Sequence, residues 1–549
     1  MTLRAAVPLA LLLVACAPET ASPPDAPPVP AADVAATERV LGLRFKPSER
    51  RLMAEDLDER RQAYATLRRH GLPDDVPPAV VFRPYEPPDG PQPEPTWSEV
   101  PPLPRPPDDA GLAWLSIGEL GHLLRSGQVT STELTKLALA RLESRGVELK
   151  AVVTLTRDRA LEQAAQADRE LASGVDRGPL HGIPYGAKDL FAVAGYPTTW
   201  GAAPFEDQVL DETAAVIARL DKAGAVLVAK LSLGELASGD VWFGGQTRNP
   251  WKPSQGSHGS SAGSGVAVAA GMVPFALGTE TWGSIVAPAD RVGVIGLRPG
   301  FGRVSRHGAM TLAWSMDKVG ALCRHAEDCA FVFDAIRGED SRDPSSIGGG
   351  FDYEPAIALE SLRIGYLEAD LAADYPGAEQ DRAFVKRLRR AGAQLVPVSL
   401  PDLPVGSMDF ILAAEAATAF DYLTRSGTDD LLVRQSRDAW PNVLRAAQLV
   451  PAVEYLRANR LRTELVAAME DLLREVDLYL APSTHGPNLL LTNLTGHPAV
   501  VLPVGFRAPN QPTTISLNGP YLSEGRLLAV ARQLQDRYGL GLNRPPGYE

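Results

Sequence analysis

Short apolar runs recur along the chain from about residue 114 to the C-terminus, separated by segments with a helical pattern. Each run is apolar along its whole length instead of at every second position, which is typical of strands covered on both faces. This alternation of strands and helices predicts an α/β fold. The expected strands lie at 151–156, 183–191, 225–233, 273–279, 292–299, 362–367, 393–400, 477–484 and 498–506.

Two helix starts in this region carry capping boxes. Ser116 is followed three residues later by Glu119, and Thr130 is followed in the same way by Glu133. In a capping box each side chain bonds the backbone N–H of the other residue, so two donors at the helix start are satisfied. We therefore expect helices to begin at these two positions. A largely helical region is expected from about 408 to 476.

The N-terminal part of the chain follows other patterns. Residues 16–36 are rich in proline and alanine without periodicity, and we expect a spacer there. Apolar positions near helical spacing predict a helix from Ser48 to about His70. Residues 37–110 are therefore expected to hold this helix and a proline-rich arm.

The arm extends from 73 to 110, where closely spaced prolines exclude both a helix and a central strand. We expect an extended, polyproline-like chain instead. Its large apolar side chains indicate that it lies over the domain and is not a free linker; they are Val80, Val81, Phe82 and Trp97. No second proline-rich break follows, so residues 111–549 are predicted to form one domain.

The first fifteen residues have the pattern of an export signal. Arg4 is followed by an apolar run, 5–15, that is too short to span a bilayer. The run ends in Leu-Val-Ala before Cys16, which resembles a bacterial lipobox and implies cleavage before Cys16 and lipid attachment to its thiol. An ordinary cleaved signal peptide is the alternative. Either interpretation predicts a protein outside the cytoplasm, and a lipid anchor would hold it in the cell envelope.

The net charge narrows the choice of partners. The net charge of -13 argues against a nucleic-acid partner, because phosphate binding relies on clustered lysine and arginine.

Cys323 and Cys329 both lie in 322–336, which has the pattern of one helix. Six residues apart, they would not share a face of that helix, so buried free thiols are expected instead of a disulfide. The histidines show no ligand spacing, and no metal site is predicted.

Candidate chemistry concentrates in 256–288, where two clusters of glycine and serine flank an apolar run. Stacked glycines usually mark a close approach of backbones. Residues 259–263 match the G-x-S-x-G nucleophile motif, but two prolines, and no strand, precede it. Ser315 and Lys318 match the S-x-x-K motif of penicillin-binding proteins, whose partner motifs S-D-N and K-T-G do not occur. Neither match is taken as a site.

Several ordered segments resemble the amidase signature family, and together they span nearly everything from residue 114 onwards. They are HGIPYGAKD (181–189), AKLSLGELA (229–237), GGQTRNPW (244–251), HGSSAGS (258–264), GTETWGSI (278–285), VGVIGLRPGFGRVSRHG (292–308) and NLTGHPAVVLPVGF (493–506). The resemblance implies a single three-layer α/β/α domain around a mixed β-sheet. It also implies an enzyme that cleaves amides with a Ser–cis-Ser–Lys triad.

Carried over to this chain, the resemblance makes Ser284 the nucleophile, Ser260 the bridging serine after a cis peptide bond, and Lys188 the base. A lysine can act as a base only when it is neutral, and burial lowers its pKa. The Ser260 hydroxyl can donate and accept a hydrogen bond at once, so it can relay a proton. The oxyanion hole is expected to consist of the backbone N–H groups of Thr281, Trp282, Gly283 and Ser284. The remaining serines, Ser257, Ser261 and Ser264, are expected to shape the loop.

The chain departs from the family at four positions near these residues. The family usually has glycine where this chain has His258, Ala262 and Trp282, and arginine where it has Val286. The indole of Trp282 would either wall the acyl pocket or pack beneath the loop. The loss of a positive charge at Val286 makes a substrate anchored there by a carboxylate less favourable.

The sequence therefore predicts hydrolysis of a small-molecule or peptide amide, without a cofactor or metal. One alternative is a glutaminase subunit of the tRNA-dependent amidotransferases, which the export signal disfavours. The other is an envelope protein that kept the fold and lost the activity. Membrane contact is expected through Cys16, and the oligomeric state stays open, with a homodimer among the options.

Overall fold

The computed structural model describes residues 28–70, 80–87 and 92–548. The predicted signal peptide and Cys16 lie outside these residues. The chain divides into two compact units, residues 1–73 with 425–427, and residues 74–424 with 428–549. Within the described residues, no helix combines the length and the apolar character needed to cross a bilayer.

The first unit contains two helices, α1 (Ala31–Leu41) and α2 (Pro47–His70). The guanidinium of Arg50 in α2 donates to both carboxylate oxygens of Glu38 in α1, at 2.7 and 2.8 Å. Helix α2 confirms the helix predicted from Ser48. The spacer predicted over 16–36 is wrong at its end, because the alanine-rich segment from Ala31 is already helical and alanine has the highest helix propensity.

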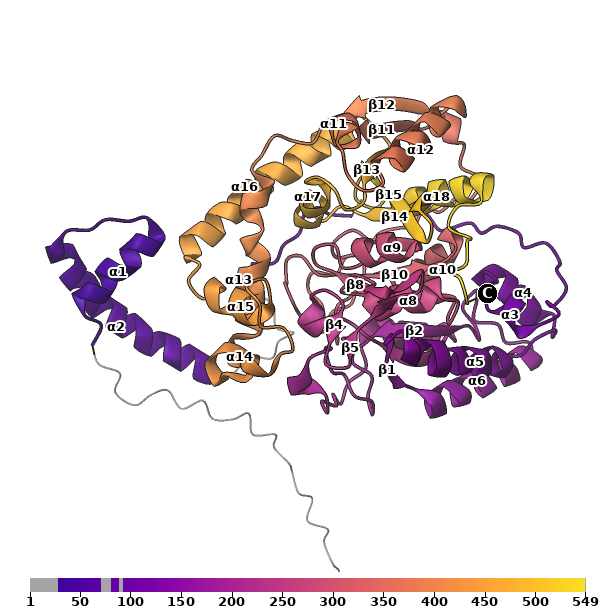
Figure 1. Cartoon of the computed structure of the whole chain (residues 1–549), viewed down its shortest axis with the longest axis horizontal. Helices are drawn as coiled ribbons and strands as arrows, with labels where there is room; N and C mark the ends of the chain where they lie inside the picture. Colours follow the sequence, from indigo (N-terminus) through magenta and orange to yellow (C-terminus); the bar gives the residue numbers. More distant parts are fainter. Residues whose placement is uncertain (1–27, 71–79, 88–91, 549) are drawn as a thin grey trace, which may run out of the picture. The chain divides into compact units, whose positions relative to one another are not determined.

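The second unit is built on an eleven-stranded sheet with the order β1-β3-β2-β8-β10-β9-β14-β15-β13-β11-β12 (Figure 1). Parallel pairs join β2 to β3 and β8, and β11 to β12 and β13, while the other neighbours are antiparallel. The strands are β1 (Val152–Leu155), β2 (Pro184–Lys188), β3 (Val226–Leu231), β8 (Phe275–Glu280), β9 (Ile295–Arg298), β10 (Lys318–Cys323), β11 (Arg363–Leu367), β12 (Gln394–Val398), β13 (Leu478–Pro482), β14 (Ala499–Ala508) and β15 (Gln511–Asn518).

All nine predicted strands are present, and the sheet is mixed as the family resemblance implies. Strands β10 and β15 were not predicted. Four two- to five-residue strands form two hairpins outside the sheet: β4 (Val241–Trp242) with β5 (Gly245–Gln246), and β6 (Arg248–Asn249) with β7 (Lys252–Gly256).

Helices cover both faces of this sheet. Neighbouring residues of one strand belong to different hydrophobic clusters: Leu227 of β3 belongs to the cluster that contains residues of α4, α7, α10 and α18, and Val228 to the one that contains residues of α5, α6, α8 and α9. This accounts for the apolar runs in the sequence. The helices after α2 are α3 (Asp109–Leu112), α4 (Ile117–Arg125), α5 (Ser131–Arg141), α6 (Arg157–Ala172), α7 (Ala215–Lys222), α8 (Ala262–Ala269), α9 (Val286–Val292), α10 (Ala326–Ile336), α11 (Glu368–Ala372), α12 (Ala378–Arg390), α13 (Phe410–Ala419), α14 (Asp421–Ser426), α15 (Trp440–Ala447), α16 (Ala452–Leu473), α17 (Asn488–Thr495) and α18 (Glu524–Tyr538).

Both predicted capping boxes are formed. Ser116 accepts from the N–H of Glu119 at the start of α4, and Thr130 accepts from the N–H of Glu133 at the start of α5. In each box the glutamate carboxylate accepts the N–H of the capping residue at 2.8 Å. The helical region predicted from 408 to 476 is confirmed by α13 to α16.

The proline-rich arm lies on the second unit, as predicted. The ring of Phe82 meets Phe301 edge to face at 5.1 Å, and the ring of Trp97 lies 4.7 Å from that of Phe331. Backbone contact adds to this, because the N–H of Thr96 donates to the carbonyl of Tyr353 at 2.9 Å. Val80, in contrast, is 89% exposed and does not anchor the arm.

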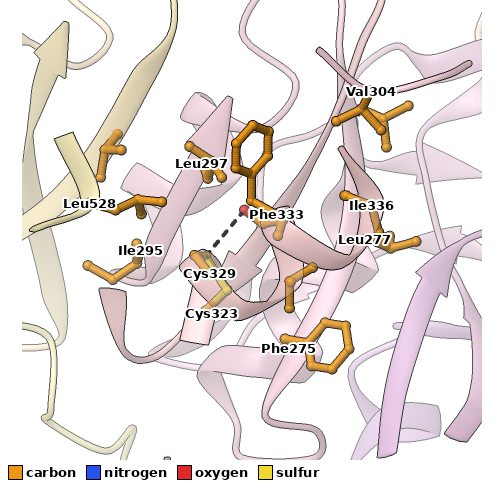
Figure 2. Close-up of a cluster of buried hydrophobic side chains, with 14 of the residues drawn as sticks. Phe275, Leu277, Ile295, Leu297, Val304, Cys323, Cys329, Phe333, Ile336 and Leu528 are labelled. Atoms are coloured by element: carbon orange, nitrogen blue, oxygen red, sulfur yellow. Dashed lines mark hydrogen bonds between the residues drawn. A yellow bond between two sulfur atoms is a disulfide. The ribbon is translucent and has the colours of Figure 1, made fainter. Parts of the chain in front are cut away.

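Cys323 and Cys329 form a disulfide, so the expectation of free thiols is wrong (Figure 2). The two residues are not on one helix. Strand β10 ends at Cys323, and α10 begins three residues later at Ala326, so the chain reverses between them. The turn brings their Cα atoms to 5.8 Å, inside the core between the sheet and α10.

Candidate functional site

Sheet topology brings Lys188 and the second serine loop to the same edge. Lys188 is the last residue of β2, and Glu280 is the last residue of β8, its parallel neighbour. Because the carboxyl ends of adjacent parallel strands meet at one edge of a sheet, the loop after Glu280 lies next to Lys188. The first serine loop, 257–261, leads into α8 and reaches this edge as well.

The ammonium position of Lys188 is enclosed by hydroxyl groups. Its Nζ donates to Ser260 Oγ at 2.7 Å and to Thr279 Oγ1 at 2.8 Å. The side chain is fully buried. Burial lowers the pKa of Lys188 to about 7, even though the negative charges of Asp317 and Glu280 favour the protonated form. A substantial fraction of the lysine is therefore neutral near pH 7.

Close backbone approach explains the glycines around Ser260. The peptide bond between Gly259 and Ser260 is cis, as the family resemblance implies. A Cβ on Gly259 would lie 1.8 Å from the carbonyl oxygen of Gly239, and one on Gly263 would lie 2.4 Å from that of Ala151. Side chains are excluded at both positions, so the loop can press against its neighbours.

The other serines of the loop bond the backbone, as expected. Ser261 Oγ donates to the carbonyl of Thr279 at 3.1 Å, and Ser264 Oγ to that of Leu277 at 2.8 Å. Ser257 Oγ donates to the carbonyl of His258 at 3.0 Å. The bonds of Ser261 and Ser264 fix the first serine loop to strand β8.

Ser284 lies beside this loop at the start of the turn into α9. Its carbonyl accepts the N–H of Ser261 at 3.1 Å, which places it one residue from Ser260 in the facing segment. The side chain of Ser284 is 8% exposed. Across the described ranges, no hydrogen bond engages its hydroxyl, and none engages the N–H groups of Thr281, Trp282, Gly283 and Ser284.

Glu280 holds this loop and was not found from the sequence. Its Oε2 accepts the N–H groups of Ile285 and Val286 at 2.8 and 2.9 Å, at the start of α9. Its Oε1 meets Arg298 at 3.0 Å and Asn493 at 2.8 Å. Burial opposes ionisation, but the charge of Arg298 and the two N–H donors hold the pKa of Glu280 below its ordinary value. An acidic residue just before a short helix, where a carboxylate can cap free N–H groups, was the available signal.

A second carboxylate fixes the other end of the loop. Thr281 Oγ1 donates to Asp317 Oδ1 at 2.5 Å. Asp317 Oδ2 accepts the N–H groups of Leu312 and Ala313 at 2.8 and 2.9 Å. Gly283 has a φ of +85°, a conformation that side chains disfavour. The loop between Glu280 and Ser284 is thus pinned at both ends while its N–H groups stay free.

A second buried lysine lies one strand away. Lys230 of β3 is fully buried, and its Nζ lies 2.7 Å from Asp189 Oδ1, which is also fully buried. Thr199 donates to Asp189 Oδ2 through its backbone N–H at 3.0 Å and its hydroxyl at 2.5 Å. The sequence did not indicate this pair, because a buried ion pair depends on contacts across the sheet.

The four residues that depart from the family pattern differ in burial and in their contacts. The side chain of Trp282 is 44% exposed, so it does not pack beneath the loop. His258 has a φ of +57°, and its N–H donates to Asp240 Oδ2 at 2.9 Å. Val286 and Ala262 are buried below the serine loops.

The S-x-x-K match does not form a catalytic pair. Ser315 Oγ donates to Glu415 Oε1 at 2.6 Å and accepts from Arg462 at 2.8 Å. The Nζ of Lys318 donates to the carbonyl of Met316. The serine and the lysine therefore have separate partners, which agrees with setting the motif aside.

A cavity adjoins the site. Thr279, which bonds Lys188, and Thr281, in the second serine loop, both line it. Most of its other lining comes from residues 306–319, between β9 and β10. Within the described part of the chain, no three histidine, cysteine, aspartate or glutamate side chains gather as a metal site would require.

Residues 133–528 match the family model described as Amidase. One subunit of the glutamyl-tRNA(Gln) amidotransferase from Synechococcus sp. (strain RCC307) is 33% identical over 479 residues, covering 78% of this chain and 99% of the relative. The structure of a native peptide amidase from Stenotrophomonas maltophilia is 30% identical with a TM-score of 0.69, covering 80% of this chain and all of that one. A bacterial aryl acylamidase, at 23% identity and a TM-score of 0.70 over 79% of this chain and 99% of that one, shares the fold.

Proposed function

Because the chain belongs to the amidase family, we propose that it hydrolyses carboxylic amides through an acyl-enzyme on Ser284. One observation carries the proposal. The fully buried Lys188, with its pKa lowered to about 7 by burial, donates a 2.7 Å hydrogen bond to Ser260, in the segment that faces Ser284. A serine hydroxyl needs an adjacent base to become a nucleophile, and a neutral lysine is such a base.

In the proposed acylation, Ser284 Oγ attacks the amide carbonyl. Its proton passes to Ser260 Oγ, whose own proton passes to the neutral Nζ of Lys188. The carbonyl oxygen gains negative charge, and the free N–H groups of Thr281 to Ser284 stabilise it. The protons then return along the same path to the leaving nitrogen, the C–N bond breaks, and the amine departs.

Deacylation repeats these steps with water. A water molecule attacks the ester carbonyl and gives its proton to the relay of Ser260 and Lys188. The ester C–O bond breaks, Ser284 recovers its proton, and a carboxylic acid is released. Glu280 and Asp317 act as positioning residues, since they hold the ends of the oxyanion loop.

Labelling with a fluorophosphonate tests the proposal. The wild-type protein should be labelled, and Ser284→Ala should abolish the label. Ser315→Ala is the matched control, because Ser315 is a partly buried serine engaged with Glu415 and Arg462, and this variant should still be labelled. Absence of label on the folded wild type would instead support a protein that kept the fold without the activity.

A panel of primary amides, peptide C-terminal amides, anilides and glutamine separates the two candidate activities. The name of the Synechococcus relative makes a role within an amidotransferase the second candidate. An amidase should hydrolyse several simple amides as an isolated chain. Turnover restricted to glutamine and dependent on added partner subunits would favour the second candidate.

We also propose that the protein is exported and carries lipid on Cys16. The Cys323–Cys329 disulfide supports export, because disulfides persist in oxidising compartments and are rare in the cytosol. Expression of the full chain with a labelled fatty acid should give a labelled envelope protein, and Cys16→Ala should lose the label. An unlabelled but exported protein would indicate an ordinary signal peptide, and a cytosolic protein with two free thiols would contradict export.

A further inference from the structure

The cavity beside the site begins at groups that take part in the proposed reaction. Thr279 lines it and accepts a hydrogen bond from Lys188 at 2.8 Å. Thr281 lines it and contributes an N–H to the oxyanion loop. An amide bound with its carbonyl in that loop therefore has one of its substituents next to the opening of the cavity.

More than half of the lining surface of the cavity is apolar. The larger apolar side chains come from the segment after β2, from the segment between β9 and β10, and from β10 itself, namely Leu190, Ala309, Met310, Leu312, Trp314 and Val319. Met310, Leu312 and Val319 are buried. Such a surface stabilises apolar groups by removing them from water.

Three of the charged side chains that line the cavity, Arg306, Asp317 and Lys318, are engaged by the protein itself. Arg306 forms two bonds to Asp343, from Nε at 3.1 Å and from the terminal nitrogen at 3.1 Å. Asp317 is engaged by Thr281 and two backbone N–H groups, and Lys318 by the carbonyl of Met316. A carboxylate brought into this region would find the charge of Asp317 and no uncommitted cation among the described lining residues.

Arg342 and His307, which also line the cavity, are likewise paired. Arg342 bonds Asp340 through Nε at 2.9 Å and a terminal nitrogen at 2.8 Å. His307 Nε2 lies 3.5 Å from Glu212 Oε2. Using either group to hold a substrate carboxylate would first break an existing contact. The cavity is therefore complementary to an uncharged group.

We propose, resting on the proposed amidase function, that this cavity selects amides carrying an uncharged apolar substituent. Each methylene group that enters should raise kcat/KM by about four-fold, since burying a methylene contributes about 0.8 kcal/mol. A carboxylate at the end of that substituent should lower kcat/KM by at least about 100-fold, because an unpaired charge would be desolvated.

Two series of p-nitroanilides and amides test this selection. In the first, the acyl group changes from acetyl to butyryl, hexanoyl and phenylacetyl, with succinyl matched to butyryl. In the second, the acyl group is constant and the amine changes from ammonia to butylamine, benzylamine and β-alanine. In one of the two series, kcat/KM should rise with the size of the apolar group and fall when the group ends in a carboxylate. A flat response in both, or a preference for succinyl or β-alanine, would overturn the proposal.

Variants at Met310 connect the selectivity to the cavity. Met310→Lys adds a cation to the wall, so the ratio of kcat/KM for the carboxylate and apolar substrates should rise at least about ten-fold. Met310→Trp reduces the space in the cavity, so kcat/KM for the phenylacetyl or benzylamine substrate should fall relative to kcat/KM for the smallest substrate. Met310→Leu, which conserves volume, should keep the wild-type ratios. Unchanged ratios in the folded Lys and Trp variants would contradict the assignment of this cavity.

The outcomes also separate this inference from the proposed function. If no amide is hydrolysed and fluorophosphonate does not label Ser284, the proposed function fails, and the inference fails with it. If amides are hydrolysed with dependence on Ser284 but without the expected size and charge preference, the function stands and only the inference fails.

Discussion

Two lysines on neighbouring strands have the same burial and different partners. Lys188 ends β2, and Lys230 lies in β3, paired in register with Ala187. Both side chains are fully buried. Lys230 has the carboxylate of Asp189 at 2.7 Å, whereas Lys188 donates to two hydroxyls, of Ser260 and Thr279.

The difference in partners decides which buried lysine could act as the proposed base. Burial disfavours the charged form of both lysines and lowers both pKa values. At Lys230 the adjacent carboxylate opposes this, so the ammonium has a partner and the pair joins the strand to the loop at 197–199. At Lys188 no carboxylate of the described residues is in contact, and the neutral form is accessible near pH 7. Asp189 follows Lys188 directly in the chain and still pairs with the other lysine.

The largest expected effect comes from removing the proposed base, Lys188. Lys188→Ala should lower kcat/KM for an amide substrate by at least about 10³-fold, as loss of a triad member does in other serine hydrolases. The hydroxyls of Ser260 and Ser284 remain but have no proton acceptor. Steady-state kinetics measure the loss of kcat/KM, and a urea unfolding curve on the same sample shows whether the variant is folded. A variant that keeps more than a tenth of the activity while folded would show that Lys188 is not the base.

Breaking the ion pair of Lys230 should lower the free energy of unfolding. Asp189→Asn leaves the Lys230 ammonium buried without its counter-charge, so the free energy of unfolding should fall by about 3–5 kcal/mol. Urea unfolding followed by fluorescence measures it. Lys230→Met is the reciprocal variant, and the double variant should recover part of the loss, because a buried pair replaced as a whole leaves no unpaired charge. Additive losses would mean that the two groups are not coupled.

The pH dependence of kcat/KM should reflect the lowered pKa of Lys188. With the pKa of Lys188 lowered to about 7, protonation below that pH removes the base. The value of kcat/KM should be constant well above pH 7 and fall about ten-fold per pH unit well below it. Rates between about pH 5 and 9 on an uncharged amide, with circular dichroism to confirm folding, test this. Full activity at the acidic end of that range would mean that the active lysine carries a proton.

Lys188, Ser260 and Ser284 could be named as candidates from the sequence because each lies in a local motif that is read without knowing the fold. The strands that it predicted are apolar runs bounded by turns. Strand β10 was missed because its last residue, Cys323, was assigned to the helix that starts at Ala326, and the disulfide was missed with it. An error of a few residues at an element boundary placed both cysteines on one helix.

The partners of the buried charges could not be read from the sequence for a different reason. Glu280 pairs with Arg298 and Asn493, and the latter is more than two hundred residues away in the chain. Such pairs depend on which strands and helices become neighbours. The motif shows that a charge is present, and only the fold shows whether it is neutralised.

The smallest expected effect concerns Trp282, an exposed residue in the loop between Glu280 and the proposed nucleophile, Ser284. Because its side chain is 44% exposed, Trp282→Ala should change the free energy of unfolding by no more than about 0.5 kcal/mol. Trp251→Ala is the matched control: that indole is buried and donates to the carbonyl of Val292 at 2.7 Å, so about 3–5 kcal/mol should be lost. The midpoint of the pH profile should stay near 7 in Trp282→Ala, since the burial that lowers the pKa of Lys188 comes from the sheet and the serine loops. A midpoint that moves up by a full unit would show that the indole shields Lys188 from water, and the contrast with Lys230 would then depend on this side chain as well.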